Sequence, residues 1–96
     1  EIDLAKAKRI VGDRLRLQQG RAYPILCNLN GLRSVDKDAW SYLAGEGSQL
    51  IEALALVYLT PLEYALSKFF MKQISSIPTQ VFREQWEAKE FLLHGN

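Results

Sequence analysis

The hydrophobic and polar positions of this sequence change their spacing several times, and each change predicts a new element. Asp3 is a good helix N-cap, because its carboxylate can accept hydrogen bonds from the free N–H groups of a first turn. Gly20 is a natural stop, because glycine tolerates a positive φ. We therefore expect a helix from Asp3 to about Gln19. Its apolar stripe consists of Leu4, Ala7, Val11 and Leu15, with Ile10 and Leu17 beside it.

A buried strand and a polar turn follow this helix. The segment Ile25–Leu29 is short and apolar, and Pro24 suits the first position of a strand rather than its middle. Asn30-Gly31 is a turn signal. We expect one strand here, followed by a turn that is the first place to look for function.

A second capped helix comes after the turn. Asp36 is the expected N-cap and Ser34 the competing one, while Asp38 lies in the first turn, where the helix dipole favours negative charge. The positions expected to face the core are Ala39, Tyr42 and Leu43, with Trp40 on the flank. Two glycines then end or interrupt this helix, and residues 48–52 would form a second short piece.

The most continuous apolar segment is Ala53–Leu59. It does not alternate, which is typical of a strand buried on both faces. A helix is the competing interpretation, because alanine and leucine favour helices. The stop signal directly after it favours the strand. Thr60-Pro61-Leu62-Glu63 places threonine at the N-cap, proline at the first helical position and glutamate at the third, which is a capping box. A helix from Pro61 to about Gln73 should follow.

The last part of the chain predicts a loop over Ser75–Pro78, a short edge strand over Thr79–Phe82 and a helix over Glu84–Leu93 that Gly95 ends. The inward positions of that helix are Ala88, Phe91 and Leu92. The order α-β-α-β-α-β-α predicts one α/β domain over residues 1–96, with a mixed or largely parallel sheet flanked by helices. Because three strands make a thin sheet and the sequence starts with Glu1, we expect the domain to be truncated, with N-terminal strands missing.

The charge balance and the cysteine content exclude some classes of function. Twelve basic and eleven acidic residues leave a net charge of +1, which argues against a nucleic-acid binder. A local basic excess lies in the first helix and is interpreted as a solvated face; its members are Lys6, Lys8, Arg9, Arg14 and Arg16. The lone cysteine, Cys27, excludes an internal disulfide and fits a reducing, cytoplasmic location, and it is most simply a small buried hydrophobe. No apolar run approaches the ~18 residues of a membrane span, and no signal peptide is visible.

No residue pattern points to catalysis. Asp36 and Asp38 are two apart on a helix and do not face each other, so capping explains both. Cys27 and His94 do not form a zinc-binding spacing, and no metal or cofactor is expected. The segment starting at Gly45 follows a helix and lacks the third glycine of a dinucleotide fingerprint. We therefore expect a protein that is not an enzyme.

The helix after the capping box carries a second candidate site. Two adjacent aromatic residues and a methionine cannot all face the sheet, so at least one is expected to be exposed or to line an apolar groove. The residues of this candidate groove are Leu66, Phe69, Phe70 and Met71. Core packing is the competing interpretation.

Two short motifs resemble the STAS domain (sulfate transporter and anti-sigma-factor antagonist). In that family a strand ending in Asp-Leu-Ser-Gly leads to Asp-Ser-Ser-Gly at a helix start. The counterparts here are Asn28-Leu29-Asn30-Gly31 and Asp36-Lys37-Asp38-Ala39. The later half is similar to a branch of bacterial STAS-like proteins of uncharacterised role, through Thr60-Pro61, Pro78-Thr79-Gln80-Val81-Phe82 and Ala88-Lys89-Glu90-Phe91-Leu92.

The resemblance implies a STAS-like fold and a regulatory role. The family's phospho-acceptor serine corresponds to Asp38, which has no hydroxyl, so this switch chemistry is expected to be lost. We expect a non-catalytic regulatory or protein-interaction domain that binds another protein. The expected contact residues are Arg33, Ser34, Asp36, Lys37, Asp38 and Trp40. Binding of a small apolar ligand or lipid is the alternative, and an open sheet edge would favour self-association.

Overall fold

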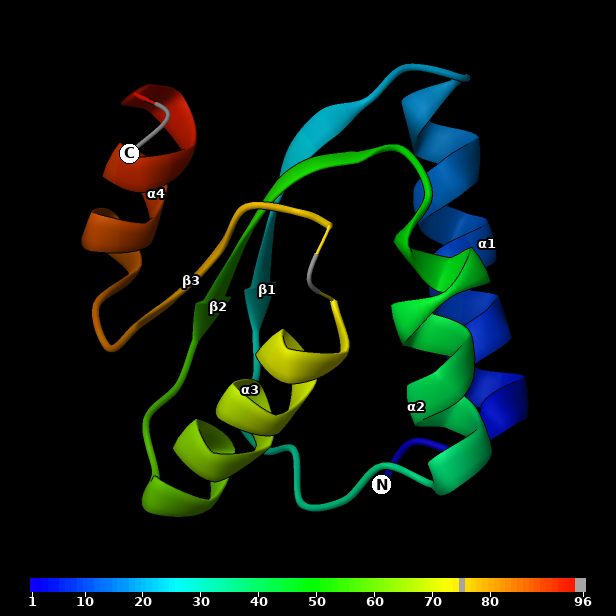
Figure 1. Ribbon diagram of the computed structural model, residues 1–96, viewed down its shortest axis with the longest axis horizontal. Coiled ribbons are helices and arrows are strands. Elements are labelled where there is room, and N and C mark those ends of the chain that lie inside the picture. The colour runs from blue at the N-terminus through cyan, green and yellow to red at the C-terminus, as the bar shows by residue number, and fades with distance from the viewer. Residues whose placement is uncertain (75, 95–96) are drawn as a thin grey trace.

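The computed structural model describes residues 1–74 and 76–94 (Figure 1). In these ranges the chain forms four α-helices, one 3-10 turn and three strands. In order they are α1 (Leu4–Gln18), β1 (Tyr23–Asn28), α2 (Lys37–Ala44), η1 (Glu46–Ser48), β2 (Ile51–Val57), α3 (Pro61–Gln73), β3 (Thr79–Phe82) and α4 (Gln85–His94). The predicted order of helices and strands is confirmed.

The three strands form one parallel sheet in the order β1-β2-β3. The central strand β2 places Leu56 opposite Cys27 of β1 and Val81 of β3. The α/β prediction is therefore correct, and every strand pair in the described residues is parallel. β1 and β3 are the edge strands. β1 contains Pro24, which has no N–H to donate to a further strand. Self-association through an edge stays a prediction.

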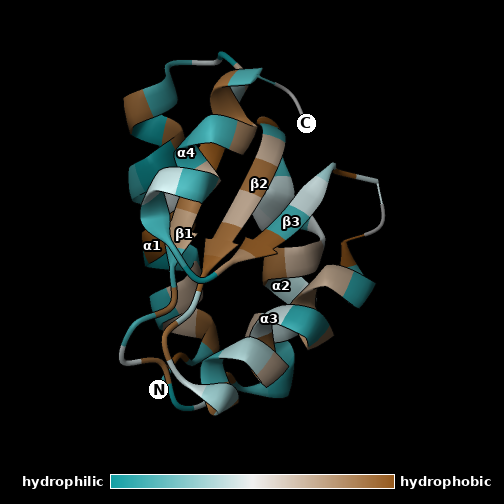
Figure 2. Cartoon of the chain, turned by 90° about the vertical axis from the view of Figure 1, so that its left-hand side faces the viewer, coloured by the Kyte–Doolittle hydropathy of each residue, from teal (hydrophilic) through white to brown (hydrophobic). Residues whose placement is uncertain are grey.

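The strand β2 is buried because helices cover both faces of the sheet (Figures 1 and 2). Ala55 and Val57 pack against Ala88 and Phe91 of α4. The alternate residues of β2 point to the opposite face, where they form the second core cluster with Ile74 and the partly buried residues of α3. A run of apolar residues without alternation follows directly from this two-sided burial.

The helix starts agree with the expected caps in two cases. The Asp3 carboxylate accepts the Lys6 N–H at 2.8 Å, and the Thr60–Glu63 capping box is complete. Asp36 is the N-cap of α2, as expected in place of the competing Ser34, but its side chain makes no capping hydrogen bond. The Asp36 backbone N–H instead donates to the Ile2 carbonyl at 2.9 Å, and this bridge between Ile2 and Val35 sets where α2 begins.

Several element boundaries differ from the sequence prediction. β1 begins at Tyr23, because the Tyr23 N–H donates to the Leu50 carbonyl at 3.2 Å, so Pro24 is the second residue of the strand. No second helical piece covers residues 48–52; η1 ends at Ser48 and β2 starts three residues later. The expected roles of Ser75 in a loop and of Gly95 as a helix stop lie outside the described residues. Among those residues, no helix combines the length and apolar character that crossing a membrane requires.

The large difference in exposure between two leucines gives a test of this packing. Leu56 is 1% exposed in the sheet, whereas Leu17 of α1 is 84% exposed. We expect Leu56→Ala to lower the free energy of unfolding by about 2–5 kcal/mol, because it removes buried methyl groups. Leu17→Ala, the matched control, should change it by less than about 0.5 kcal/mol. Urea unfolding followed by circular dichroism measures both, and equal effects would contradict the fold.

Candidate functional site

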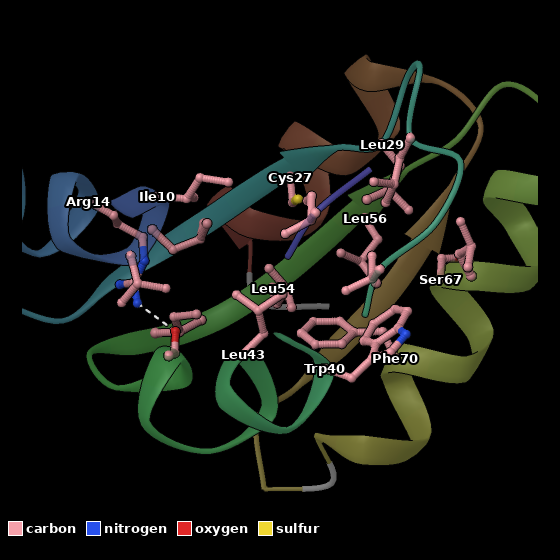
Figure 3. Close-up of a pocket in the computed structure, with 18 of the residues that line it drawn as sticks. Ile10, Arg14, Cys27, Leu29, Trp40, Leu43, Leu54, Leu56, Ser67 and Phe70 are labelled. Carbon is pink, nitrogen blue, oxygen red and sulfur yellow. Dashed lines mark hydrogen bonds between the residues drawn. The ribbon is translucent and has the colours of Figure 1, made fainter. Parts of the chain in front are cut away.

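An apolar cavity of about 320 Å³ lies between the sheet and the helices α1, α2 and α3 (Figure 3). Five parts of the chain line it. They contribute Ile25, Cys27, Leu54 and Leu56 from the sheet, Ile10, Val11 and Arg14 from α1, Trp40 and Leu43 from α2, Leu66, Ser67 and Phe70 from α3, and Leu29, Leu32, Val35 and Gly47 from loops and η1. In Figure 3, Arg14 lies toward one end and Trp40 with Phe70 toward the other. The cavity is therefore a partly open space whose walls are almost entirely apolar.

This space remains because α1 and α2 pack mainly on each other, whereas α3 packs mainly on β3. α1 contacts α2 and η1, and α3 contacts β3 and α2, while the face of β1 toward the cavity is less closely covered. The side chain that α3 turns inward at this point is Ser67, which is fully buried and small. Its hydroxyl donates to the Tyr64 carbonyl at 2.7 Å, so it leaves no unpaired polar group.

One glycine lets the backbone of η1 lie close to α1 and α2 at the edge of the cavity. Gly47 of η1 is buried, and a Cβ added there would lie 3.0 Å from the Tyr42 carbonyl oxygen and 3.1 Å from Cγ2 of Val11. No larger residue fits without displacing η1 from α1 and α2. The two-glycine segment that ends α2 therefore has a packing role.

The carboxylate of Glu63 ties together two loops at one edge of the sheet. Its Oε1 accepts the N–H groups of Leu59 at 2.7 Å and Thr60 at 3.2 Å, and its Oε2 accepts the Gly31 N–H at 2.9 Å. Gly31 takes a φ of +88°, which glycine adopts readily. These backbone donors hold the pKa of Glu63 below its ordinary value of 4.5, although burial opposes the shift.

The loop that follows β1 forms one wall of the cavity and is held at three points. The Leu29 N–H donates to the Val57 carbonyl at 2.9 Å, Gly31 binds Glu63, and Val35 pairs with Ile2. Three apolar side chains of this loop form part of the cavity wall: Leu29, Leu32 and Val35. The stretch between β1 and α2, which the sequence singled out, is therefore both a cavity wall and a surface loop.

The polar residues predicted to make contacts lie on the outer side of that loop. Arg33, Ser34, Asp36, Lys37 and Asp38 are all exposed. None of their side chains makes a hydrogen bond or ion pair with another described residue. Trp40 differs, because it is half-buried, lines the cavity and packs against Phe69 and Phe70 with ring centroids 5.1 and 5.3 Å apart.

The candidate groove of α3 is only partly brought together. Leu66 and Phe70 line the cavity. Phe69 is 47% exposed and packs against Trp40, and Met71 packs in the core cluster with Leu54 and Leu56 without lining the cavity. The buried positions of α3 include two polar residues, Glu63 and Ser67, which hydrophobic spacing does not reveal.

Arg14 is a lining residue that the sequence interpretation missed. It was expected on a solvated basic face, but it is half-buried. Its guanidinium donates to the Gly47 carbonyl at 2.9 Å (Figure 3). It also donates to the side-chain oxygen of Gln18. Burial lowers the pKa of Arg14, and Tyr42 opposes this shift. Its spacing of three and four residues from Val11 and Ile10 was the available signal, since these positions share a helix face.

Cys27 also lines the cavity, close to the C-terminal end of β1 (Figure 3). Burial raises the pKa of its thiol, which keeps the sulfur in the less reactive protonated form. In the described residues no group of three His, Cys, Asp or Glu side chains could hold a metal ion. The cavity is thus lined by apolar side chains, with Arg14, Cys27 and Ser67 as its polar side chains.

A protein-family model supports the existence of this domain as a recurring unit. The model described as "Domain of unknown function (DUF7793)" matches residues 1–95. The chain belongs to the DUF7793 family. Neither the curated proteins nor the solved structures contain a match to it. The STAS resemblance is not tested by these comparisons and stays a prediction.

The shifted pKa of Glu63 predicts a pH dependence of stability in this DUF7793 domain. A depressed pKa in the folded state means that the ionised carboxylate stabilises the fold above its unfolded pKa, and that this contribution is lost as pH falls below 4.5. We expect Glu63→Gln to be less stable than the wild type at neutral pH, with the difference shrinking on acidification. Urea midpoints measured between about pH 7 and pH 3 test this.

The control for that experiment is Glu52→Gln, which removes an exposed carboxylate of β2. Its difference from the wild type should stay small at every pH. A Glu63→Gln difference that is the same at neutral and acidic pH would show that the carboxylate does not tie the two loops as described.

Proposed function

We propose that this domain binds a small apolar ligand in the cavity between the sheet and the helices α1, α2 and α3, without catalysing a reaction. The observation that carries the proposal is the cavity itself, with its lining of aliphatic and aromatic side chains. Its volume of about 320 Å³ lies at the lower end of the ~300–1,000 Å³ range of small-molecule sites.

The energetic cost of leaving such a cavity empty supports a ligand. In core mutants, stability falls by roughly 24 cal/mol for each Å³ of cavity. Apolar surface left without contacts therefore matters in a small domain, whose total stability is only about 5–15 kcal/mol. Apolar cavities stay dry and bind apolar molecules; one of about 150 Å³ binds benzene. A ligand would recover much of this free energy.

Cys27 gives a direct test, because its side chain lies at the centre of the lining. We expect Cys27→Phe to fill part of the cavity, and so to weaken binding of the neutral apolar dye N-phenylnaphthylamine at least tenfold. The same substitution should leave the free energy of unfolding unchanged or raise it by up to about 1 kcal/mol, as cavity-filling changes do. Dye fluorescence and urea unfolding measure the two effects.

The matched control is Cys27→Ala, which enlarges the cavity at the same position and should retain dye binding. The proposal is wrong if the wild type does not bind the dye, or if both variants bind it equally well. A destabilisation of Cys27→Phe by about 1–3 kcal/mol would indicate overpacking, and hence that no usable space exists beside β1.

A second candidate function is docking of another protein on the loop after β1. Five exposed polar side chains without partners in the described residues favour it, together with a backbone that Glu63 and Ile2 hold in place. The resemblance to STAS proteins, whose phospho-acceptor position corresponds to Asp38, supports a regulatory role of the same loop. Because Leu32 and Val35 of this loop also line the cavity, ligand binding and docking would be coupled.

Charge reversal tests the docking surface. We expect Asp38→Arg to abolish capture of a specific protein partner by the immobilised domain, because it replaces an exposed negative charge in the first turn of α2. Glu87→Arg is the control, since Glu87 is exposed in the first turn of α4 on the other side of the sheet. Quantitative mass spectrometry of captured proteins gives the comparison. If the wild type, Asp38→Arg and Glu87→Arg all capture the same proteins, docking through this loop is excluded.

A further inference from the structure

We propose that the ligand is an anionic amphiphile with a single aliphatic chain, whose tail occupies the cavity and whose carboxylate binds the guanidinium of Arg14. This inference rests on the proposed function, because it names the ligand class of the same cavity. Nothing in the apolar lining selects between hydrocarbons, so the polar end of the ligand must be recognised at the margin. Arg14 is the one charged side chain that lines the cavity in the described residues.

The hydrogen bonds of Arg14 leave its charge without a counter-ion. Its guanidinium donates to two neutral acceptors, the Gly47 carbonyl and the Gln18 side chain. Among residues 1–74 and 76–94, no carboxylate lies within 4.0 Å of it. The neighbouring Asp13 pairs with Arg16, and Glu46 is exposed. The remaining N–H donors of Arg14 are available, and a guanidinium presents them in a planar fork that matches a carboxylate.

The position of Arg14 is held by the protein before any ligand arrives. Gln18 is buried, and its amide nitrogen donates to the carbonyls of Arg21 and Leu50, each at 2.8 Å. Gln18 therefore links the end of α1 to the start of β2 and presents its oxygen to Arg14. A side chain held in this way loses less entropy on binding than a free surface arginine does.

Partial burial makes an anion favourable at this position. A cation that is withdrawn from water without an anionic partner carries a desolvation cost, and the lowered pKa of Arg14 has the same cause. A carboxylate at the guanidinium offsets that cost and adds charge-assisted hydrogen bonds. The cavity volume fits one short chain and not the two chains of a membrane phospholipid. These properties favour a free fatty-acid-like molecule.

The experiment compares two ligands of equal chain length, decanoate and decanol, by isothermal titration calorimetry below their aggregation concentrations. We expect the wild-type protein to bind decanoate about tenfold more tightly than decanol, a factor that corresponds to about 1.4 kcal/mol. This preference should decrease as salt concentration rises, because part of the interaction is electrostatic.

Substitutions of Arg14 assign the preference to its charge. Arg14→Gln should lose the preference for decanoate over decanol. Arg14→Lys keeps a positive charge and should retain part of the preference for decanoate. A loss of this preference in Arg14→Gln alone can then be assigned to the missing charge and not to destabilisation of the fold. Arg9→Gln is the matched control, because Arg9 is exposed on the same helix and does not line the cavity; it should behave like the wild type.

The outcomes separate this inference from the proposed function. If neither ligand binds the wild type, the cavity is not a binding site and both proposals are wrong. Equal affinity for decanoate and decanol, or a preference that persists in Arg14→Gln, would overturn the inference and leave apolar binding in place. Binding to vesicles of anionic phospholipid with no binding of free decanoate would indicate a membrane surface as the partner and would also overturn it.

Discussion

The buried carboxylate of Glu63 is the interaction on which the geometry of the site depends. It accepts backbone N–H groups from the turn after β2 and from the loop after β1, which are adjacent because neighbouring parallel strands end at the same edge of a sheet. A buried charge must be met by hydrogen bonds. Both loops and the first turn of α3 are therefore restricted to one arrangement, and from it α3 directs Ser67 and Phe70 toward the sheet.

The two faces of the sheet are covered differently, and this difference creates the cavity. On one face, small residues such as Ala55 and Ala88 let α4 approach β2 closely. On the other face, α1 packs on α2 and η1 rather than on β1, and the space between them is closed by the loop after β1. Arg14 and Gln18 fasten α1 to η1 and β2 at the end of this space. The helices thus border the cavity without filling it.

Local patterns predicted much of the fold. The cap at Asp3, the capping box at Thr60–Glu63 and the bounds of α3 and β3 all follow from interactions within a few residues, and they are correct. The start of β1 was predicted two residues too late, and the helical piece predicted before β2 is not formed. Both differences depend on the hydrogen bond between Tyr23 and Leu50, which joins residues far apart in the sequence. Asp36 is the N-cap of α2 as predicted, but its side chain makes no capping hydrogen bond, which the local pattern did not reveal.

The sequence by itself determined the order of helices and strands and the two-sided burial of β2. Only the tertiary structure decided that Arg14 faces the cavity and that Glu63 reaches Gly31. These residues are separated along the chain by many positions, and periodicity reports which face of an element is apolar, not which element lies opposite. The physical reason is that secondary structure follows from short-range hydrogen bonding and burial, whereas a cavity is defined by the residual space between elements that pack on one another.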